Sequence, residues 1–106
     1  MRIDYHKLVR NRIPEIIRRE GRQCETRIAS DEEFVSLLRT KLIEEAQEAA
    51  TASGAEMVKE LADLLEVMDA LVAAYNLDYD AIRVRQAERR RDRGGFDKRL
   101  ILLWTE

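Results

Sequence analysis

The chain has 106 residues and a formal net charge of −2, with 45% hydrophobic, 38% charged and 6% aromatic residues. This length predicts a single domain, residues 1–106, with a modest core. No apolar run approaches the roughly 18–20 residues of a membrane span, and the first residues lack the apolar segment of a secretory signal. The single Cys24 excludes an internal disulfide and fits a reducing compartment, so we expect a cytoplasmic location.

The charges are strongly segregated along the chain. Residues 1–27 hold eight Lys or Arg against four acids, residues 31–80 hold three against thirteen, and residues 83–99 hold eight against three. An acidic centre with basic ends suits a metal site combined with phosphate-binding arms.

The N-terminal part predicts one short helix. Pro14 suits the first turn of a helix, which we expect to cover residues 15–19 and to stop at Gly21. Three basic residues come just before it: Lys7, Arg10 and Arg12. Taken alone, these three fit a solvated surface and a phosphate-binding role about equally well, because charge runs are common.

Two long amphipathic helices are predicted over residues 31–52 and 54–75. Apolar residues recur along both at the spacing of one helix face. Ser30 and Glu33 form a capping box at the start of the first helix, and Ser53 should cap the second. The only turn sequence between them lies around that second serine, so the chain should double back into a helical hairpin.

A fourth, very basic helix should follow the hairpin. Asn76 is a stop signal, Asp78 is a candidate cap, and the helix should cover residues 79–93 and end at Gly94. The short apolar run over residues 96–104 predicts an extended C-terminal tail that packs back on the domain.

Four acidic residues of the two long helices should converge. Glu45 with Glu48, and Glu60 with Asp63, are i,i+3 pairs, so each pair lies on one helix face. Glu48 and Glu60 are each six residues from Gly54, and the other two are each nine, so the pairs come level across the hairpin. Carboxylates repel one another unless they are neutralised, and the usual neutralising group is a hard divalent cation with oxygen ligands.

Two of these acids, Glu45 and Glu60, lie inside the apolar stripes. Acidic side chains are seldom buried unless they are paired or bind a ligand. The alternative is that they pair with Lys or Arg, or lie at a frayed edge. Because several acids break the pattern together at matched heights, a functional site is the better interpretation.

Three motifs resemble those of the MazG-like all-α nucleoside triphosphate pyrophosphohydrolases. Residues 44–48, followed by residues 60–63, resemble the EExxE…ExxD signature of that superfamily. Residues 7–15, KLVRNRIPE, resemble the KLVRDKIPE opening of its small phosphoribosyl-ATP pyrophosphohydrolase-like group, and residues 93–99 resemble the RGGF…KR ending. The resemblance covers nearly the whole chain. It departs from the pattern at Asn11, where the group commonly has Asp, and in the short gap between the acidic motifs.

The resemblance implies a Mg²⁺-dependent hydrolase, with Mn²⁺ as an alternative ion. It would cut a nucleoside triphosphate, or phosphoribosyl-ATP, between the α and β phosphates to give monophosphate and pyrophosphate. Carried over by position, the implied metal ligands are Glu45, Glu48, Glu60 and Asp63. Glu44 is a weaker candidate, as a ligand or as a base that orients water, so the catalytic candidates are Glu44 and Glu45. The candidate phosphate-binding residues are Lys7, Arg10, Arg12, Arg93, Lys98 and Arg99.

We therefore expect an all-α fold whose hairpin forms a four-helix bundle on dimerisation, as a homodimer or a dimer of dimers. The reason is that two wide apolar stripes have little cover within one chain. One alternative is a non-catalytic dimeric module that binds nucleic acid through the basic helix near residues 83–93. The acidic centre argues against it. Another alternative is an inactive structural bundle, which the complete set of five carboxylates argues against.

Overall fold

The computed structural model describes residues 1–106 and contains only helices, so the predicted all-α class is confirmed. The helical elements are α1 (Ile13–Arg19), α2 (Asp31–Thr51), the 3₁₀ turn η1 (Gly54–Glu56), α3 (Met57–Ala74) and α4 (Tyr79–Arg93). Each of the four α-helices was expected from the sequence, with ends within three residues of those observed. None of them combines the length and the apolar character that a bilayer crossing requires.

The chain divides into two compact units, Met1–Tyr75 and Asn76–Glu106. The predicted stop at Asn76 is confirmed, because this residue has a positive φ of 52° just after α3. Asp78 then accepts a hydrogen bond from the Asp80 amide at 2.9 Å and caps α4, as expected. The prediction that all 106 residues form one domain stays a prediction.

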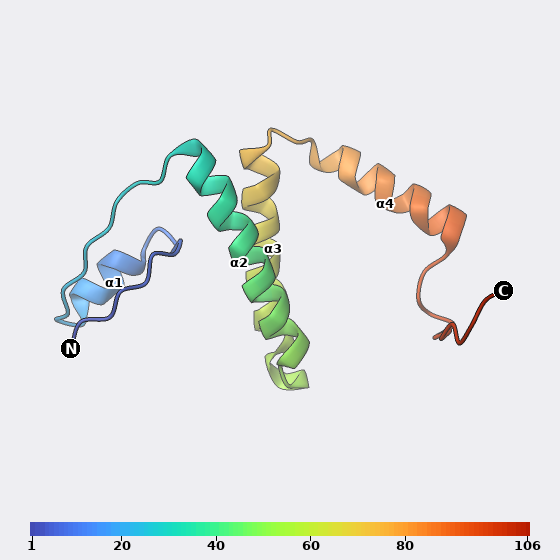
Figure 1. The fold of residues 1–106 in the computed structure, drawn as a ribbon, viewed down its shortest axis with the longest axis horizontal. Coiled ribbons are helices and arrows are strands. Elements are labelled where there is room, and N and C mark those ends of the chain that lie inside the picture. Colours follow the sequence, from blue (N-terminus) through green and yellow to red (C-terminus); the bar gives the residue numbers. More distant parts are fainter. The chain divides into compact units, whose positions relative to one another are not determined.

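Helices α2 and α3 run side by side in opposite directions and form the predicted hairpin (Figure 1). Leu38 and Ala49 of α2 and Val67 of α3 are its buried apolar residues. Arg39 of α2 donates a hydrogen bond to the Tyr75 hydroxyl and lies over the tyrosine ring, 5.6 Å from its centroid. This contact ties α2 to the C-terminal end of α3.

The start of α2 is the predicted capping box. The Ser30 hydroxyl accepts from the Glu33 amide at 3.2 Å, and the Glu33 carboxylate accepts from the Ser30 amide at 3.3 Å. The corresponding prediction for Ser53 is wrong, because its side chain makes no capping bond. The chain enters a 3₁₀ turn there, and the Ser53 carbonyl accepts from the Glu56 amide at 3.0 Å. This turn lies between the two long helices.

The segment before the hairpin holds α1. The helix starts two residues earlier than expected, with Pro14 in its first turn, and ends before Gly21, whose φ is +80°. Glycine reaches this left-handed conformation without strain, which explains why the short helix stops there. Cys24 is half-buried, and its thiol contacts the Pro14 carbonyl at 3.8 Å.

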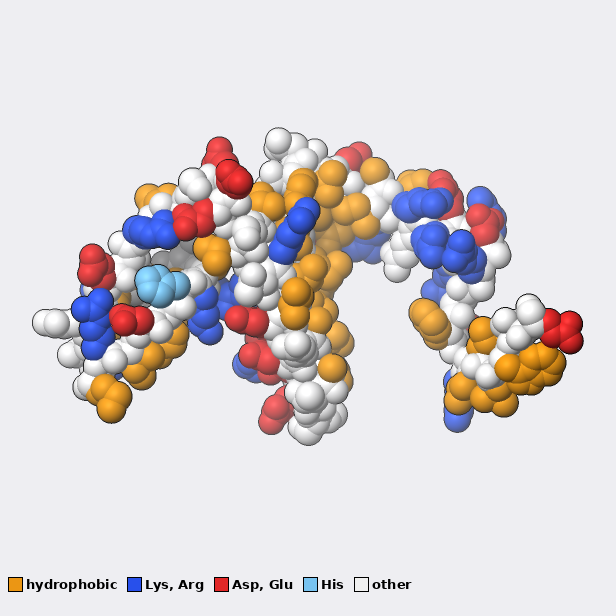
Figure 2. Space-filling view, in the orientation of Figure 1, with side chains coloured by type: hydrophobic (Ala, Val, Ile, Leu, Met, Phe, Trp, Pro, Cys, Tyr) orange, Lys and Arg blue, Asp and Glu red, His pale blue; other side chains and the backbone are white.

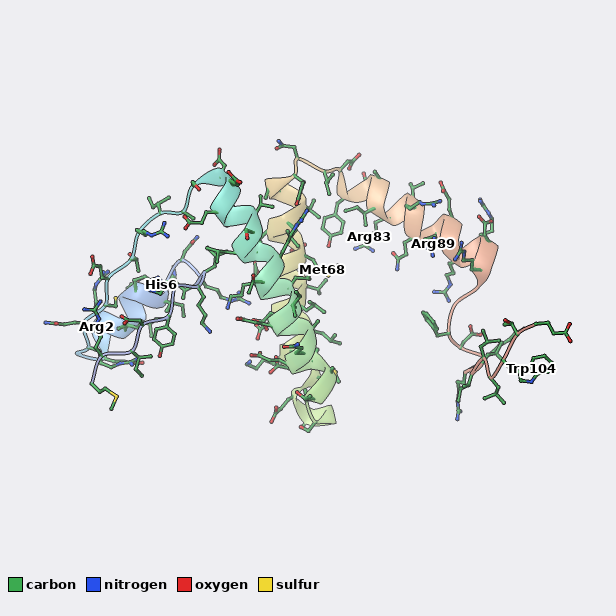
Figure 3. The ribbon with its side chains drawn as sticks, viewed as in Figure 1. Arg2, His6, Met68, Arg83, Arg89 and Trp104 are labelled. Carbon is green, nitrogen blue, oxygen red and sulfur yellow. The ribbon has the colours of Figure 1, made fainter.

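In the second unit, α4 carries its arginines into solvent, as Arg83 and Arg89 show (Figure 3). Gly94, with φ +84°, ends the helix as predicted. No helix or strand follows, and a turn closes with the Arg99 amide donating to the Phe96 carbonyl at 3.0 Å. The apolar side chains after this turn are exposed. The packing predicted for the tail stays a prediction.

Candidate metal centre

Three of the four predicted carboxylates meet between α2 and α3. Glu45 comes from α2, and Glu60 and Asp63 come from α3. Each of the three residues offers a carboxylate oxygen, and these oxygens lie within 4.8 Å of one another. The i,i+3 spacing on α3 puts two of the acids on one face, and the hairpin brings the third opposite them.

The two glutamates of this triad are poorly satisfied by the protein. Glu60 is buried, with only 8% of its surface exposed, and Glu45 is half-buried. Oε2 of each is buried and has no hydrogen-bond partner. A buried carboxylate oxygen without a partner is costly, so it calls for an explanation such as a bound ion.

Burial raises the pKa of Glu45, and the nearby charges of Glu48 and Asp63 raise it further, while Lys41 opposes the rise. The cause is the cost of holding an anion away from water and beside other anions. A divalent cation at this point would relieve both effects.

Cations of the protein itself partly neutralise the triad. The Lys59 ammonium lies 3.4 Å from Glu60 Oε1 and 3.2 Å from Asp63 Oδ2. The Lys41 ammonium lies 3.9 Å from Glu45 Oε1, and Arg10 donates to Asp63 Oδ1 at 2.9 Å. The alternative of pairing with Lys or Arg is therefore realised in part, although it leaves the two Oε2 atoms unsatisfied.

Two further predicted acids lie beside the triad. Glu48 is exposed and outside the group of close oxygens, although its side chain interacts with that of Glu45. Glu48 was expected to lie level with Glu60 across the hairpin, but its carboxylate does not join the oxygens of the triad. Glu44 is half-buried and lies 3.9 Å from the Lys41 ammonium.

The six predicted phosphate-binding residues differ in their surroundings. Arg10 alone contacts the triad, as described above. The Lys7 ammonium lies over the Tyr5 ring, 5.9 Å from its centroid, and the exposed Arg12 makes no ion pair. The other three belong to the second unit: Arg93, Lys98 and Arg99. Of these, Arg93 lines an open groove along α4 with Arg85, Arg89 and Phe96.

Lys41 and Lys59 were not singled out from the sequence. The signal was nevertheless present, because Lys41 precedes Glu45, and Lys59 precedes Asp63, by four residues on a helix. Residues four apart on a helix are neighbours. The contact of Arg10 has no such local signal, since 53 residues separate it from Asp63.

The chemistry of the triad fits a hard metal ion. All its donors are carboxylate oxygens, which suit Mg²⁺, Mn²⁺ or Ca²⁺ better than the softer ions that prefer sulfur or imidazole. The two unsatisfied Oε2 atoms supply lone pairs that nothing else in the protein uses. The acidic cluster is therefore able to bind a metal ion.

A helical hairpin with facing acidic motifs defines the class of the MazG-like all-α proteins. Within that class, a family model for phosphoribosyl-ATP pyrophosphohydrolase matches residues 4–91, so the chain belongs to this family. The matched range includes every residue of the triad and Arg10, and stops before Arg93. Searches of curated proteins and of solved structures found no match. The family is one of hydrolases that act on acid anhydrides.

Proposed function

We propose that this protein is a Mg²⁺-dependent nucleotide pyrophosphohydrolase that cleaves its substrate between the α and β phosphates. The family membership supports the reaction class. The observation that carries the proposal is the Glu45, Glu60 and Asp63 triad, with its two unsatisfied buried oxygens. A nucleic-acid-binding function is less well supported, because the acidic centre would repel a phosphate backbone.

The triad residues are the proposed metal ligands, and Glu48 is a fourth ligand at the exposed edge. When bound, the ion would neutralise phosphate charge and lower the pKa of the attacking water. Glu44 and Glu45 are the candidates that orient this water. The half-buried position of both residues leaves each side chain within reach of solvent.

The proposed substrate is a nucleoside triphosphate or phosphoribosyl-ATP, the compound that the family description names. Both carry the anhydride chain that the reaction requires. Arginine is the better residue for holding such a chain, because its planar fork of donors matches two phosphate oxygens at once. The proposed clamps remain the six basic residues at the two ends of the chain.

The test is a panel of nucleotides, including phosphoribosyl-ATP, incubated with the protein and Mg²⁺ and separated by chromatography. We expect nucleoside monophosphate and pyrophosphate as the products. Glu60→Gln should lower the rate on the order of 100-fold or more, because it removes a ligand charge while keeping the shape of the side chain. Circular dichroism should show intact helices in this variant.

Glu56→Gln is the matched control, since Glu56 immediately precedes the same helix but is exposed and makes no ion pair. This variant should keep wild-type activity. Formation of nucleoside diphosphate and orthophosphate would refute cleavage between the α and β phosphates. Full activity in Glu60→Gln would refute the metal-ligand assignment.

A further inference from the structure

The two ion pairs that span the longest stretches of sequence both belong to Arg10, and one of them ends on the candidate metal centre. Arg10 Nη2 donates to Asp63 Oδ1 at 2.9 Å, and Arg10 Nη1 lies 3.6 Å from Glu66 Oε1. The remaining ion pairs are local and join residues at most six positions apart. Arg10 is therefore the one cation that a separate segment of the chain brings to the triad.

This guanidinium and a metal ion need the same oxygen atoms. Arg10 occupies Oδ1 of Asp63, and Lys59 occupies Oδ2 at 3.2 Å. An ion held by Asp63 would lie roughly 2.0–2.6 Å from one of these oxygens, depending on the ion. A guanidinium in its present position would then face a double positive charge at short range, which is unfavourable.

The two protein cations differ in what must move when an ion arrives. Lys59 is a residue of α3 itself, and its exposed side chain can rotate away without any change of backbone. Arg10 lies in the irregular segment that precedes α1, and its side chain reaches the triad from there. Releasing its guanidinium breaks ion pairs that join the segment before α1 to the hairpin, whereas releasing Lys59 breaks only contacts within α3.

We propose that Arg10 is an intramolecular competitor for the metal centre. It neutralises Asp63 when no ion is bound, and binding of a divalent cation displaces it together with the segment before α1. This inference rests on the proposed function, because it takes the triad to be the metal site. A consequence is that Arg10 becomes free to bind a phosphate oxygen only when the ion is in place.

The first test is the affinity for Mg²⁺, measured by isothermal titration calorimetry without nucleotide. Removing the competing charge in Arg10→Gln should tighten Mg²⁺ binding about two- to fivefold, the range expected for loss of a partly exposed ion pair. Arg18→Gln is the matched control, since Arg18 lies in the adjacent α1 and makes no ion pair. This control should bind Mg²⁺ as the wild type does.

The second test is limited proteolysis of the wild-type protein by trypsin, with fragments identified by mass spectrometry. Saturating Mg²⁺ should raise the rate of cleavage after Arg10, because the segment before α1 would no longer be held at Asp63 and could enter the protease site more easily. Cleavage after Arg93 in the second unit corrects for any effect of Mg²⁺ on trypsin itself. An unchanged normalised rate would overturn the displacement.

The outcomes separate this inference from the proposed function. Equal or weaker Mg²⁺ binding in Arg10→Gln, with measurable binding by the wild type, would overturn the competitor role and leave the metal centre standing. If neither protein binds Mg²⁺ or Mn²⁺, the metal centre and the competitor role both fail. Binding by Arg10→Gln alone would be the strongest support for competition.

Discussion

Glu60 is a carboxylate at a position where the packing of α2 on α3 calls for an apolar side chain. It shares its helix face with Leu64, Val67 and Leu71, which line the hairpin. Burial of an ionised carboxylate costs several kcal/mol unless strong partners compensate. Its carboxylate pairs with the Lys59 ammonium alone, at 3.4 Å. A residue kept at such a cost is better explained by binding than by stability.

Glu33 shows the opposite situation, an acid that the fold stabilises. Arg27 donates two hydrogen bonds to its carboxylate, at 2.7 and 2.6 Å, and this pairing lowers the pKa of Glu33 from 4.5 to about 2. Because the folded-state pKa lies below the unfolded one, the unfolded chain binds more protons between these values. The stabilisation is present above the unfolded pKa and is lost as the pH falls through about 2.

Glu33→Gln should therefore make the stability of the protein less sensitive to acid. The glutamine can still accept the hydrogen bond of the capping box, so the helix start is kept. We expect the urea midpoint of the variant to fall less steeply than that of the wild type between about pH 4.5 and 2. Glu32→Gln, one residue away and without an ion pair, is the control. Identical pH profiles for Glu33→Gln and wild type would contradict the prediction.

At the scale of the element, α3 carries two apolar stripes. One faces α2. The other is directed away from it and recurs at alternating steps of three and four residues, the spacing of a coiled-coil seam. Its members are Val58, Leu61, Leu65, Met68 and Val72. All but the half-buried Val72 are exposed, and hydrophobic side chains are visible along the hairpin (Figure 2).

We propose that a second copy of the hairpin covers this outer stripe, as a homodimer or a dimer of dimers. A contiguous exposed apolar surface on a helix marks an interaction site, and closed two-fold pairing is the commonest way to cover one. The stripe has the length and spacing to form one side of a four-helix bundle. The covering copy would complete the core that a single hairpin lacks.

Leu65→Asp should dissociate this dimer. Leu65 is 53% exposed within the single chain, so aspartate is tolerated in the monomer but would be buried in the interface. Sedimentation equilibrium at micromolar concentration should give a dimer or tetramer for the wild type and a monomer for the variant. Ile28→Asp, in the exposed connector before α2, should keep the wild-type mass. A wild-type protein that is a folded, active monomer would rule out the proposed dimer.

For the whole molecule, the concentration of acidic residues in the hairpin links metal binding to the free energy of unfolding. The acidic centre holds thirteen acids against three Lys or Arg within residues 31–80. Without an ion, the carboxylates of the hairpin repel one another and leave two oxygens unsatisfied. A ligand that binds only the folded state stabilises it in proportion to the logarithm of its concentration over Kd.

Mg²⁺ should therefore raise the melting temperature. At a hundredfold excess over Kd the stabilisation is about 2.7 kcal/mol, which corresponds to a shift on the order of 10 °C for a chain of this size. Differential scanning calorimetry at one fixed protein concentration gives the measurement. NaCl at matched ionic strength is the control, because simple screening also weakens repulsion. Equal shifts in NaCl and MgCl₂ would show that no specific site forms.

Much of this molecule was predictable because its elements depend on local signals. The caps at Ser30 and Asp78, the positive φ at Asn76 and Gly94, and the helical spacing of apolar residues each act within a few residues. Helix bounds and the all-α class follow from them. The acidic pairs on α2 and α3 could be recognised for the same reason. Residues spaced i,i+3 share a helix face, whatever distant residues do.

The composition of the centre was decided only by the tertiary structure. Three acids meet while Glu48 stays at the exposed edge, because the rotation of α2 against α3 depends on the packing of the hairpin and on the 3₁₀ turn that joins the helices. The arrival of Arg10 at Asp63 depends on the path of the segment before α2. Contacts between residues 53 positions apart follow from packing, which no local spacing in the sequence specifies.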